Sequence, residues 1–194
     1  MEISAFVALV VPFIIIVYLA VLLFLQAPRT VVLASLLGGL VTGLLNALFD
    51  LTAYYAHWWH YTLDGGIPLQ LCLSDPCKHY TLGTLNAVIL HLPLPFYITP
   101  ILIYGSTVYL LIWRFWGSHR SHWLALLLLV GVPIFGALRD IYGSALTHTS
   151  YVTWDSIVAW PFDVLMWVVM FYSGFFVFRR LSASLPSFRT QNPA

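Results

Sequence analysis

The sequence predicts an all-α integral membrane protein, a single bundle of about five transmembrane helices, and three observations support this fold class. Hydrophobic residues make up 61% of the 194 residues and charged residues only 8%, whereas a soluble domain has about 25% charged residues. Apolar segments of about 20 residues, the length that crosses a hydrocarbon core of ~30 Å, recur along the chain. The arginines fall mainly in the connections that such a bundle places on one side of a membrane.

This composition also excludes several functional classes. The mean hydropathy is +0.90, and so few charged residues cannot cover the surface of a soluble enzyme or keep a chain disordered. The net charge of +1 lacks the basic excess that nucleic-acid binding requires. The bilayer is therefore the first predicted partner of the chain.

Each span should be a helix, because in the hydrocarbon core every backbone polar group must be paired within its own segment. The predicted spans are residues 3–25, 30–50, 96–116, 121–144 and 152–178. Proline interrupts the apolar stretch before the third span at Pro93, Pro95 and Pro100, so residues 81–92 are predicted to form a separate shallow segment. Small residues in the second span predict close helix packing there: Gly38, Gly39 and Gly43.

The basic residues predict the orientation, because Lys and Arg are enriched in short cytoplasmic loops. With the N-terminus outside and the C-terminus in the cytoplasm, the inner side holds Arg29, Arg114, Arg120, Arg179, Arg180 and Arg189. The predicted outer loop, residues 57–83, then holds one basic residue, Lys78. Residues 1–180 form the transmembrane domain and residues 181–194 a mobile cytoplasmic tail. We expect a multi-pass protein of the plasma (inner) membrane.

The two cysteines, Cys72 and Cys77, both lie in the predicted outer loop. A cysteine pair on the oxidising side of a membrane is expected to form a disulfide bond. A redox couple is the alternative, although such couples use Cys-x-x-Cys spacing and a stabilised thiolate.

The polar residues near or within the spans gather toward the predicted outer ends, which suggests a pocket open to that side. The candidate pocket residues are Asp50, His57, His60, Asn86, His91, Arg139, Asp140, Asp155 and Asp163. A charge at the centre of a spanning helix costs about 2.5–3.5 kcal/mol on insertion scales, so it needs a partner inside the bundle. Asp163 is the expected partner of Arg139 by depth, followed by Asp140 or Asp50. The pair would either lock two helices together or form the floor of the pocket.

No cofactor and no metal ligand is assigned. If a metal were bound, His57 and His60 would be the candidates, because residues three apart share one face of a helix. Trp58 and Trp59 have two interpretations: an aromatic belt at the membrane interface, or a wall on which a flat ligand stacks.

Three functions remain open. The first is a membrane-embedded enzyme or binding protein whose outward-facing pocket takes a lipid-like ligand, such as an isoprenoid, a quinone or an acyl lipid. No motif of a known catalytic class is present, so no catalytic residue is assigned. The second is an accessory or structural subunit without a site of its own, bound to a membrane partner. The third is a small transporter or channel, which would require oligomerisation to build a continuous polar path.

Overall fold

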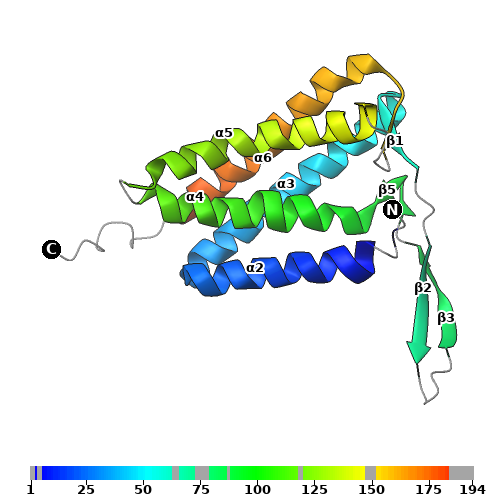
Figure 1. The fold of residues 1–194 in the computed structure, drawn as a ribbon, viewed down its shortest axis with the longest axis horizontal. Helices are drawn as coiled ribbons and strands as arrows, with labels where there is room; N and C mark the ends of the chain where they lie inside the picture. Colours follow the sequence, from blue (N-terminus) through cyan, green and yellow to red (C-terminus); the bar gives the residue numbers. More distant parts are fainter. Residues whose placement is uncertain are drawn as a thin grey trace.

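The computed structural model describes residues 3, 6–62, 66–72, 79–86, 88–117, 120–146 and 152–183. Five helical segments in it are long and apolar enough to cross a membrane: Phe6–Leu25, Arg29–Tyr55, Leu94–Trp116, His122–Gly143 and Ile157–Ser182. The prediction of a five-helix membrane bundle is thereby confirmed at the level of helix number, length and composition. Figure 1 shows the five segments running roughly side by side along the long axis of the molecule.

Several of these segments are built from more than one helical element. The first contains the π-helical segment η1 (Phe6–Val10) and α2 (Val11–Leu25), and the second is α3 (Arg29–Tyr55). The third contains η2 (Leu94–Tyr97), η3 (Thr99–Thr107) and α4 (Val108–Trp116). The fourth contains α5 (His122–Asp140) and η4 (Ile141–Leu146), and the fifth contains η5 (Ile157–Ala159) and α6 (Trp160–Ala183). The predicted tail, residues 181–194, therefore begins as helix, and residues 184–194 lie outside the described part of the chain.

The all-α prediction omitted six short strands at one end of the bundle. They are β1 (Trp59–Tyr61), β2 (Gly66–Cys72), β3 (His79–Asn86), β4 (Val88–Ile89), β5 (Leu92–Pro93) and β6 (Val152–Trp154). They pair as three antiparallel two-stranded sheets, β1 with β6, β2 with β3 and β4 with β5. The segment predicted as shallow, residues 81–92, consists mainly of parts of β3, β4 and β5, and the β2–β3 ribbon extends away from the helices in Figure 1.

The pairing of β1 with β6 also moves the start of the last span. Trp59 lies opposite Trp154, and their rings are 5.5 Å apart. Cross-strand aromatic pairs stabilise such a ladder, so residues 152–154 belong to a sheet and the helix begins only at Ile157.

Close approach of the helices depends on glycine, as the cluster in the second span predicted. α3 packs most extensively against α6 and η3. A Cβ atom on Gly38 would lie 2.7 Å from the carbonyl oxygen of Gly174, and one on Gly39 would lie 2.9 Å from the backbone nitrogen of Ser106. The backbones of three helices therefore meet where no side chain intervenes.

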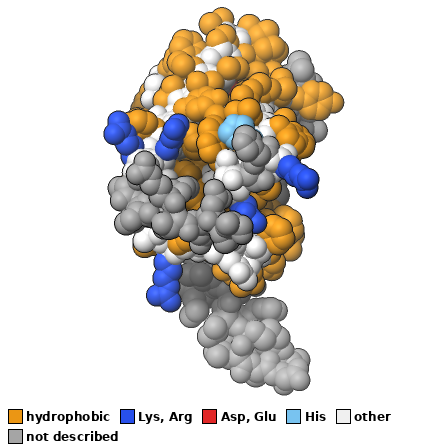
Figure 2. Space-filling view, turned by 90° about the vertical axis from the view of Figure 1, so that its left-hand side faces the viewer, with side chains coloured by type: hydrophobic (Ala, Val, Ile, Leu, Met, Phe, Trp, Pro, Cys, Tyr) orange, Lys and Arg blue, Asp and Glu red, His pale blue; other side chains and the backbone are white. Residues whose placement is uncertain are grey.

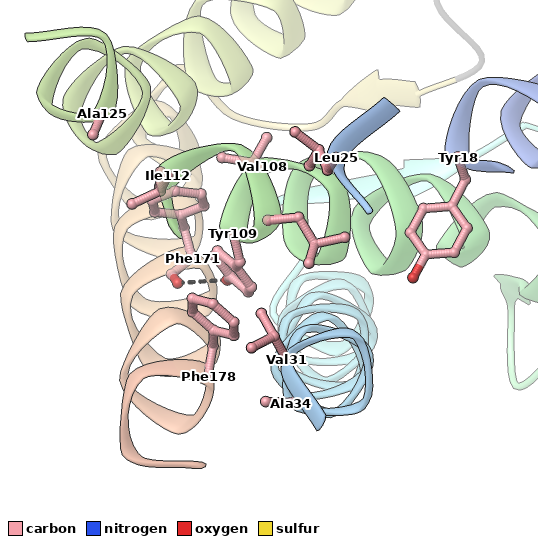
Figure 3. Close-up of a cluster of buried hydrophobic side chains, with 11 residues drawn as sticks. Tyr18, Leu25, Val31, Ala34, Val108, Tyr109, Ile112, Ala125, Phe171 and Phe178 are labelled. Atoms are coloured by element: carbon pink, nitrogen blue, oxygen red, sulfur yellow. Dashed lines mark hydrogen bonds between the residues drawn. The ribbon is translucent and has the colours of Figure 1, made fainter. Parts of the chain in front are cut away.

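Hydroxyl groups link the same helices in the middle of the bundle. Tyr109 donates a hydrogen bond to the carbonyl oxygen of Phe171 at 2.8 Å and lies 2.8 Å from Oγ1 of Thr42. Ser106 Oγ lies 3.0 Å from the Tyr18 hydroxyl and 2.8 Å from Ser35 Oγ. Figure 3 shows Tyr109 within the surrounding apolar cluster, with its hydrogen bond to Phe171. The middle of the described bundle is thus filled by packed side chains with internally paired hydroxyl groups.

Apart from Arg139, which lies beside Asp140, the described acidic and basic residues separate to the two ends of the bundle. The end at which α3 and α5 finish holds all the described acids, Asp50, Asp140, Asp155 and Asp163, and we call it the acidic end. The opposite end, which we call the arginine end, holds Arg29, Arg114, Arg120, Arg179 and Arg180. Figure 2 views the molecule from the arginine end and shows basic side chains and no acidic ones on this face.

Candidate functional site

A cavity of about 390 Å³ lies at the acidic end, between the helices and the β1–β6 sheet. Its charged and amide side chains come from α3, α5 and α6 and are Asn46, Asp50, Arg139, Asp140 and Asp163. Its aromatic lining includes Trp59, Tyr61, Tyr97, Tyr104, Trp154 and Trp167. The structure therefore brings together four of the predicted pocket residues, one from each of α3 and α6 and two from α5.

Asp50 is fixed by three hydrogen-bond donors. The carboxylate is buried, with 3% of the residue exposed, near the end of α3. Nε1 of Trp59 donates to Oδ1 at 3.0 Å, while the hydroxyl groups of Tyr61 and Tyr97 donate to Oδ2 at 2.7 and 2.8 Å. Because these donors belong to β1 and η2, the carboxylate holds the strand and the start of the third span against α3.

Arg139 is paired with its neighbour Asp140. Its Nε donates to Asp140 Oδ1 at 2.9 Å and its Nη2 donates to the same oxygen. Its Nη1 donates to the hydroxyl of Tyr104 at 3.0 Å. The expectation that Asp163 would be the ion-pair partner is therefore wrong, because the long arginine side chain folds back to the adjacent carboxylate on its own helix.

Trp167 completes this arrangement from α6. Its Nε1 donates to Asp140 Oδ2 at 2.8 Å, and its ring lies 5.6 Å from the Arg139 guanidinium carbon. A Cβ atom on Gly136 would overlap the indole ring, so the absence of a side chain there lets Trp167 reach Asp140. Both oxygens of Asp140 are thus occupied by donors within the protein.

Two other side chains that line the cavity each contain a polar atom that lacks a hydrogen-bond partner among the described residues. These atoms are Oδ2 of Asp163 and Nε1 of Trp154, and both atoms are buried. Asn46, also on the wall, donates its amide to the sulfur of Met166 at 3.2 Å, and a thioether is a weak acceptor. A buried polar group without a partner costs about 1–3 kcal/mol, so such groups on one cavity wall suggest that a ligand or water completes them.

Of the other predicted site residues, His57, His60, His91 and Asp155 do not line the cavity, and the side chain of Asn86 is not described. His60 pairs with Asp155 at 3.0 Å, and 38% and 32% of these side chains are exposed. The ring of His91 stacks on Tyr54 with centroids 4.1 Å apart. The backbone of Asn86 pairs with Gly66 in the β2–β3 ribbon.

The predicted disulfide lies outside the described residues, since Cys77 is not described and only the backbone of Cys72 is, as part of β2. In the described part of the chain no group of three or more His, Cys, Asp or Glu side chains is placed to hold a metal ion. His57 and His60 do not share a helical face, because α3 ends before them and His60 lies in β1.

Sequence reasoning missed the aromatic donors that define the site. Trp59 and Tyr61 both reach Asp50, as expected for residues two apart on a strand, whose side chains point to the same face. The helical interpretation of residues 57–60 concealed this alternation. Trp58, by contrast, stacks on Phe162 with ring centroids 3.9 Å apart, so the two tryptophans have different roles.

His57 ends α3 in a left-handed conformation, with φ of 54°. Trp58 N donates to the carbonyl oxygen of Ala53 at 2.9 Å, and His57 N donates to that of Tyr54 at 3.3 Å. This is the Schellman arrangement, in which glycine is favoured at the left-handed position.

We therefore expect His57→Gly to raise the free energy of unfolding by up to about 1 kcal/mol, because a side chain in this conformation carries a steric cost. Thermal unfolding in mild detergent measures the effect, with Leu90→Gly, at φ of 52° in a separate turn and with an exposed side chain, as a second left-handed position. A lower melting temperature for His57→Gly would indicate that the imidazole makes a stabilising contact.

The chain matches no protein-family model, no curated protein and no solved structure. Its function is therefore inferred from the chemistry of the cavity. Asp50 and Asp140 use both of their carboxylate oxygens within the protein. Asp163, with 3% of the residue exposed, has an uncommitted oxygen and is the cavity carboxylate best placed to accept a hydrogen bond from a ligand or to exchange a proton with it.

Proposed function

We propose that this chain is a multi-pass membrane protein that binds a lipid-like ligand in the cavity at the acidic end. The observation that carries the proposal is that two side chains lining one cavity, Asp163 and Trp154, each contain a buried polar atom with no partner among the described residues, Oδ2 and Nε1 respectively. Ligand pockets combine mostly apolar walls with a few converging polar groups. The polar head of the ligand would meet these two atoms, and Phe6, Val10 and Phe96 offer an apolar wall for its tail.

The charges in the cavity favour a particular class of head group. Three carboxylates, Asp50, Asp140 and Asp163, line it together with one guanidinium, Arg139, whose Nε and Nη2 donate to Asp140. A phosphate or carboxylate head would meet three acidic side chains, and the one guanidinium of the cavity already donates to Asp140. An uncharged head with a hydroxyl group, such as an alcohol or a hydroquinone, can accept from Trp154 and donate to Asp163.

The proposal also includes an orientation. The arginine end would face the cytoplasm of a bacterial-type plasma membrane and the acidic end would face outside, because basic residues are enriched on the cytoplasmic side. Labelling of Arg120→Cys with a membrane-impermeant reagent, in a chain whose native Cys72 and Cys77 are replaced by serine, tests this orientation. Labelling in broken but not in intact cells would agree with it, and the reverse would overturn it.

The ligand proposal is tested with Asp163→Asn, which replaces one carboxylate oxygen by an NH2 group of similar size, and with Trp154→Phe, which removes the indole N–H and leaves a smaller aromatic ring. We expect the purified wild-type protein to carry a defined adduct in native mass spectrometry. Each variant should lower its occupancy, with affinity reduced about tenfold, the equivalent of 1.4 kcal/mol and of one hydrogen bond to a buried group.

Thr107→Val is the matched control, because Thr107 Oγ1 is also buried without a partner but does not line the cavity. This control should retain the adduct. Equal loss of the adduct in Thr107→Val, or full retention of the adduct in both cavity variants, would contradict the proposal. A wild-type chain without any adduct, recovered with one stoichiometric membrane protein, would instead favour the accessory-subunit function.

A transporter would need a polar path between the two ends of the bundle. In the described part of the chain, the apolar cluster around Tyr109 and Phe171 occupies the middle of the bundle. The hydroxyl groups of Ser35 and Ser106 are hydrogen-bonded to each other. A pore within one chain therefore receives no support from the structure, and flux in reconstituted vesicles would have to come from an oligomer.

A further inference from the structure

We propose that a second cavity, at the arginine end, binds one anionic phospholipid, with the phosphate on Arg179 and part of an acyl chain between α4 and α6. This cavity has a volume of about 320 Å³ and is lined mainly by apolar side chains. Ile112 and Trp116 of α4 and Phe178 of α6 form walls, and Arg179 and Ser182 contribute polar groups. The cavity shares no lining residue with the one at the acidic end.

The shape and lining of the cavity fit a chain attached to a polar head. Pockets of about 300–1,000 Å³ bury small ligands, mostly by apolar contact. Tryptophan side chains at the ends of spanning helices lie at the level of lipid head groups, and Trp116 is the last residue of α4. An acyl chain would fill the apolar part of the cavity, which a free phosphate ion would leave empty.

No described acid lies near the arginine of this cavity, so an anion from outside the described chain could bind it. Asp163 is the described acid on the same helix, and it lies 16 residues before Arg179, about 24 Å at the helical rise of ~1.5 Å per residue. None of the described acids lies at the arginine end. A guanidinium binds phosphate oxygens through two parallel hydrogen bonds, and basic pockets between spanning helices bind anionic lipid head groups.

Arg179 is the arginine whose side chain lines this cavity. The guanidinium carbon of the neighbouring Arg180 lies 5.0 Å from the ring centroid of Phe176. Arg29 belongs to the same end of the bundle but does not line the cavity. Substitution of Arg179 and of Arg29 can therefore distinguish lipid binding by one arginine from attraction by the overall positive charge of this end.

The experiment compares phosphatidylglycerol with phosphatidylcholine of identical acyl chains, titrated into the full-length protein in detergent and followed by native mass spectrometry. We expect the wild type to bind phosphatidylglycerol about tenfold more tightly than phosphatidylcholine, a difference of 1.4 kcal/mol. Arg179→Gln should abolish this preference, whereas Arg29→Gln should retain it. Arg179→Lys, which keeps the charge but loses the two-pronged geometry, should retain part of it.

A fourth variant tests the acyl-chain part of the proposal. Gly117 lines the cavity, its φ is −73°, and a Cβ atom there would meet no heavy atom within 4 Å. Gly117→Leu should therefore fold normally and place bulk in or beside the cavity, weakening the binding of both lipids several-fold. Asp163→Asn, a variant of the other cavity, should leave the lipid preference unchanged, so the two proposals can fail separately.

Four results would overturn the inference. An equal loss of the preference for phosphatidylglycerol in Arg29→Gln and Arg179→Gln would show that the whole basic surface attracts the lipid. Unchanged lipid binding in Gly117→Leu would show that no acyl chain occupies the part of the cavity that Gly117 lines. Displacement of phosphatidylglycerol by millimolar inorganic phosphate would show a site for a free anion. An unchanged preference in Arg179→Gln, with an unaltered elution profile, would remove Arg179 from the site.

Discussion

Gly39→Val is expected to destabilise the bundle by about 3 kcal/mol or more. A Cβ atom at this position would overlap the carbonyl oxygen of Ile101 and lie 2.9 Å from the backbone nitrogen of Ser106. These are backbone atoms, which cannot move aside as a flexible side chain can, so α3 and η3 would have to separate. Overpacking of a filled interior costs about 1–3 kcal/mol even where side chains can adjust. Separation would also lengthen the 2.8 Å hydrogen bond between Ser35 and Ser106.

Thermal unfolding in mild detergent, together with the yield of monodisperse protein, measures this effect. Gly131→Val is the matched control, because Gly131 lies within α5 and a Cβ atom there would meet nothing within 4 Å. Valine has a higher helix propensity than glycine, so the control should be as stable as the wild type or slightly more stable. Similar melting temperatures for the two variants would show that α3 and η3 are farther apart than the structure has them.

The helices of this fold could be predicted from the sequence because one physical requirement determines them. A segment that crosses hydrocarbon must be long, apolar and internally hydrogen-bonded. The predicted span 96–116 and the observed Leu94–Trp116 accordingly differ by two residues at one end. The glycines of the second span predicted close packing for an equally direct reason, since only residues without a side chain allow backbones to touch.

The strands could not be predicted because no comparable requirement acts at the end of the bundle. β1 and β6 are three residues each, too short for an alternating pattern to stand out from the surrounding aromatic residues. Their pairing joins Trp59 to Trp154, 95 residues later in the chain. A single sequence contains no signal for such a distant contact, so the wall of the cavity was not foreseen.

The candidate site was predicted only in part. The sequence indicates how far along a helix a residue lies, but not the direction in which its side chain points. Depth along the helices correctly grouped Asp50, Arg139 and Asp163. The pairing of β1 with β6 was not available, and it brings His60 and Asp155 together at the surface. The direction of each side chain around its helix axis was not available either. The unknown side-chain directions explain why Asp140, and not Asp163, accepts the hydrogen bonds of Arg139.

The two ends of the molecule offer opposite chemistry to a membrane. The cavity at the acidic end has hydrogen-bonding groups and an excess of carboxylates, whereas the cavity at the arginine end has Arg179 and no described acid. Between them, Tyr109 and Thr42 are hydrogen-bonded within the protein. Ligands at the two ends would therefore bind independently unless the helices themselves move.

Asp50→Ala should be the most destabilising substitution of a polar residue at the acidic end, with a cost of about 3–5 kcal/mol. The substitution removes the common acceptor of Trp59, Tyr61 and Tyr97. A hydrogen bond to a charged group contributes about 1.5–3 kcal/mol, and a buried donor that loses its acceptor adds a desolvation cost. Loss of these three bonds would release β1 and η2 from α3, so the cavity wall should open along with the loss of stability.

Thermal unfolding followed by tryptophan fluorescence is the appropriate measurement, since the buried Trp59 is itself a donor to Asp50. Asp155→Ala is the control, because its partly exposed pair with His60 should contribute less than about 1 kcal/mol. If Asp50→Ala were as stable as this control, the carboxylate would not hold the wall together. Asp50→Asn keeps the volume and one acceptor oxygen, so its loss of stability should be smaller. Retention of the ligand adduct by Asp50→Asn, with loss in Asp163→Asn, would assign Asp50 to the architecture of the cavity and Asp163 to the ligand.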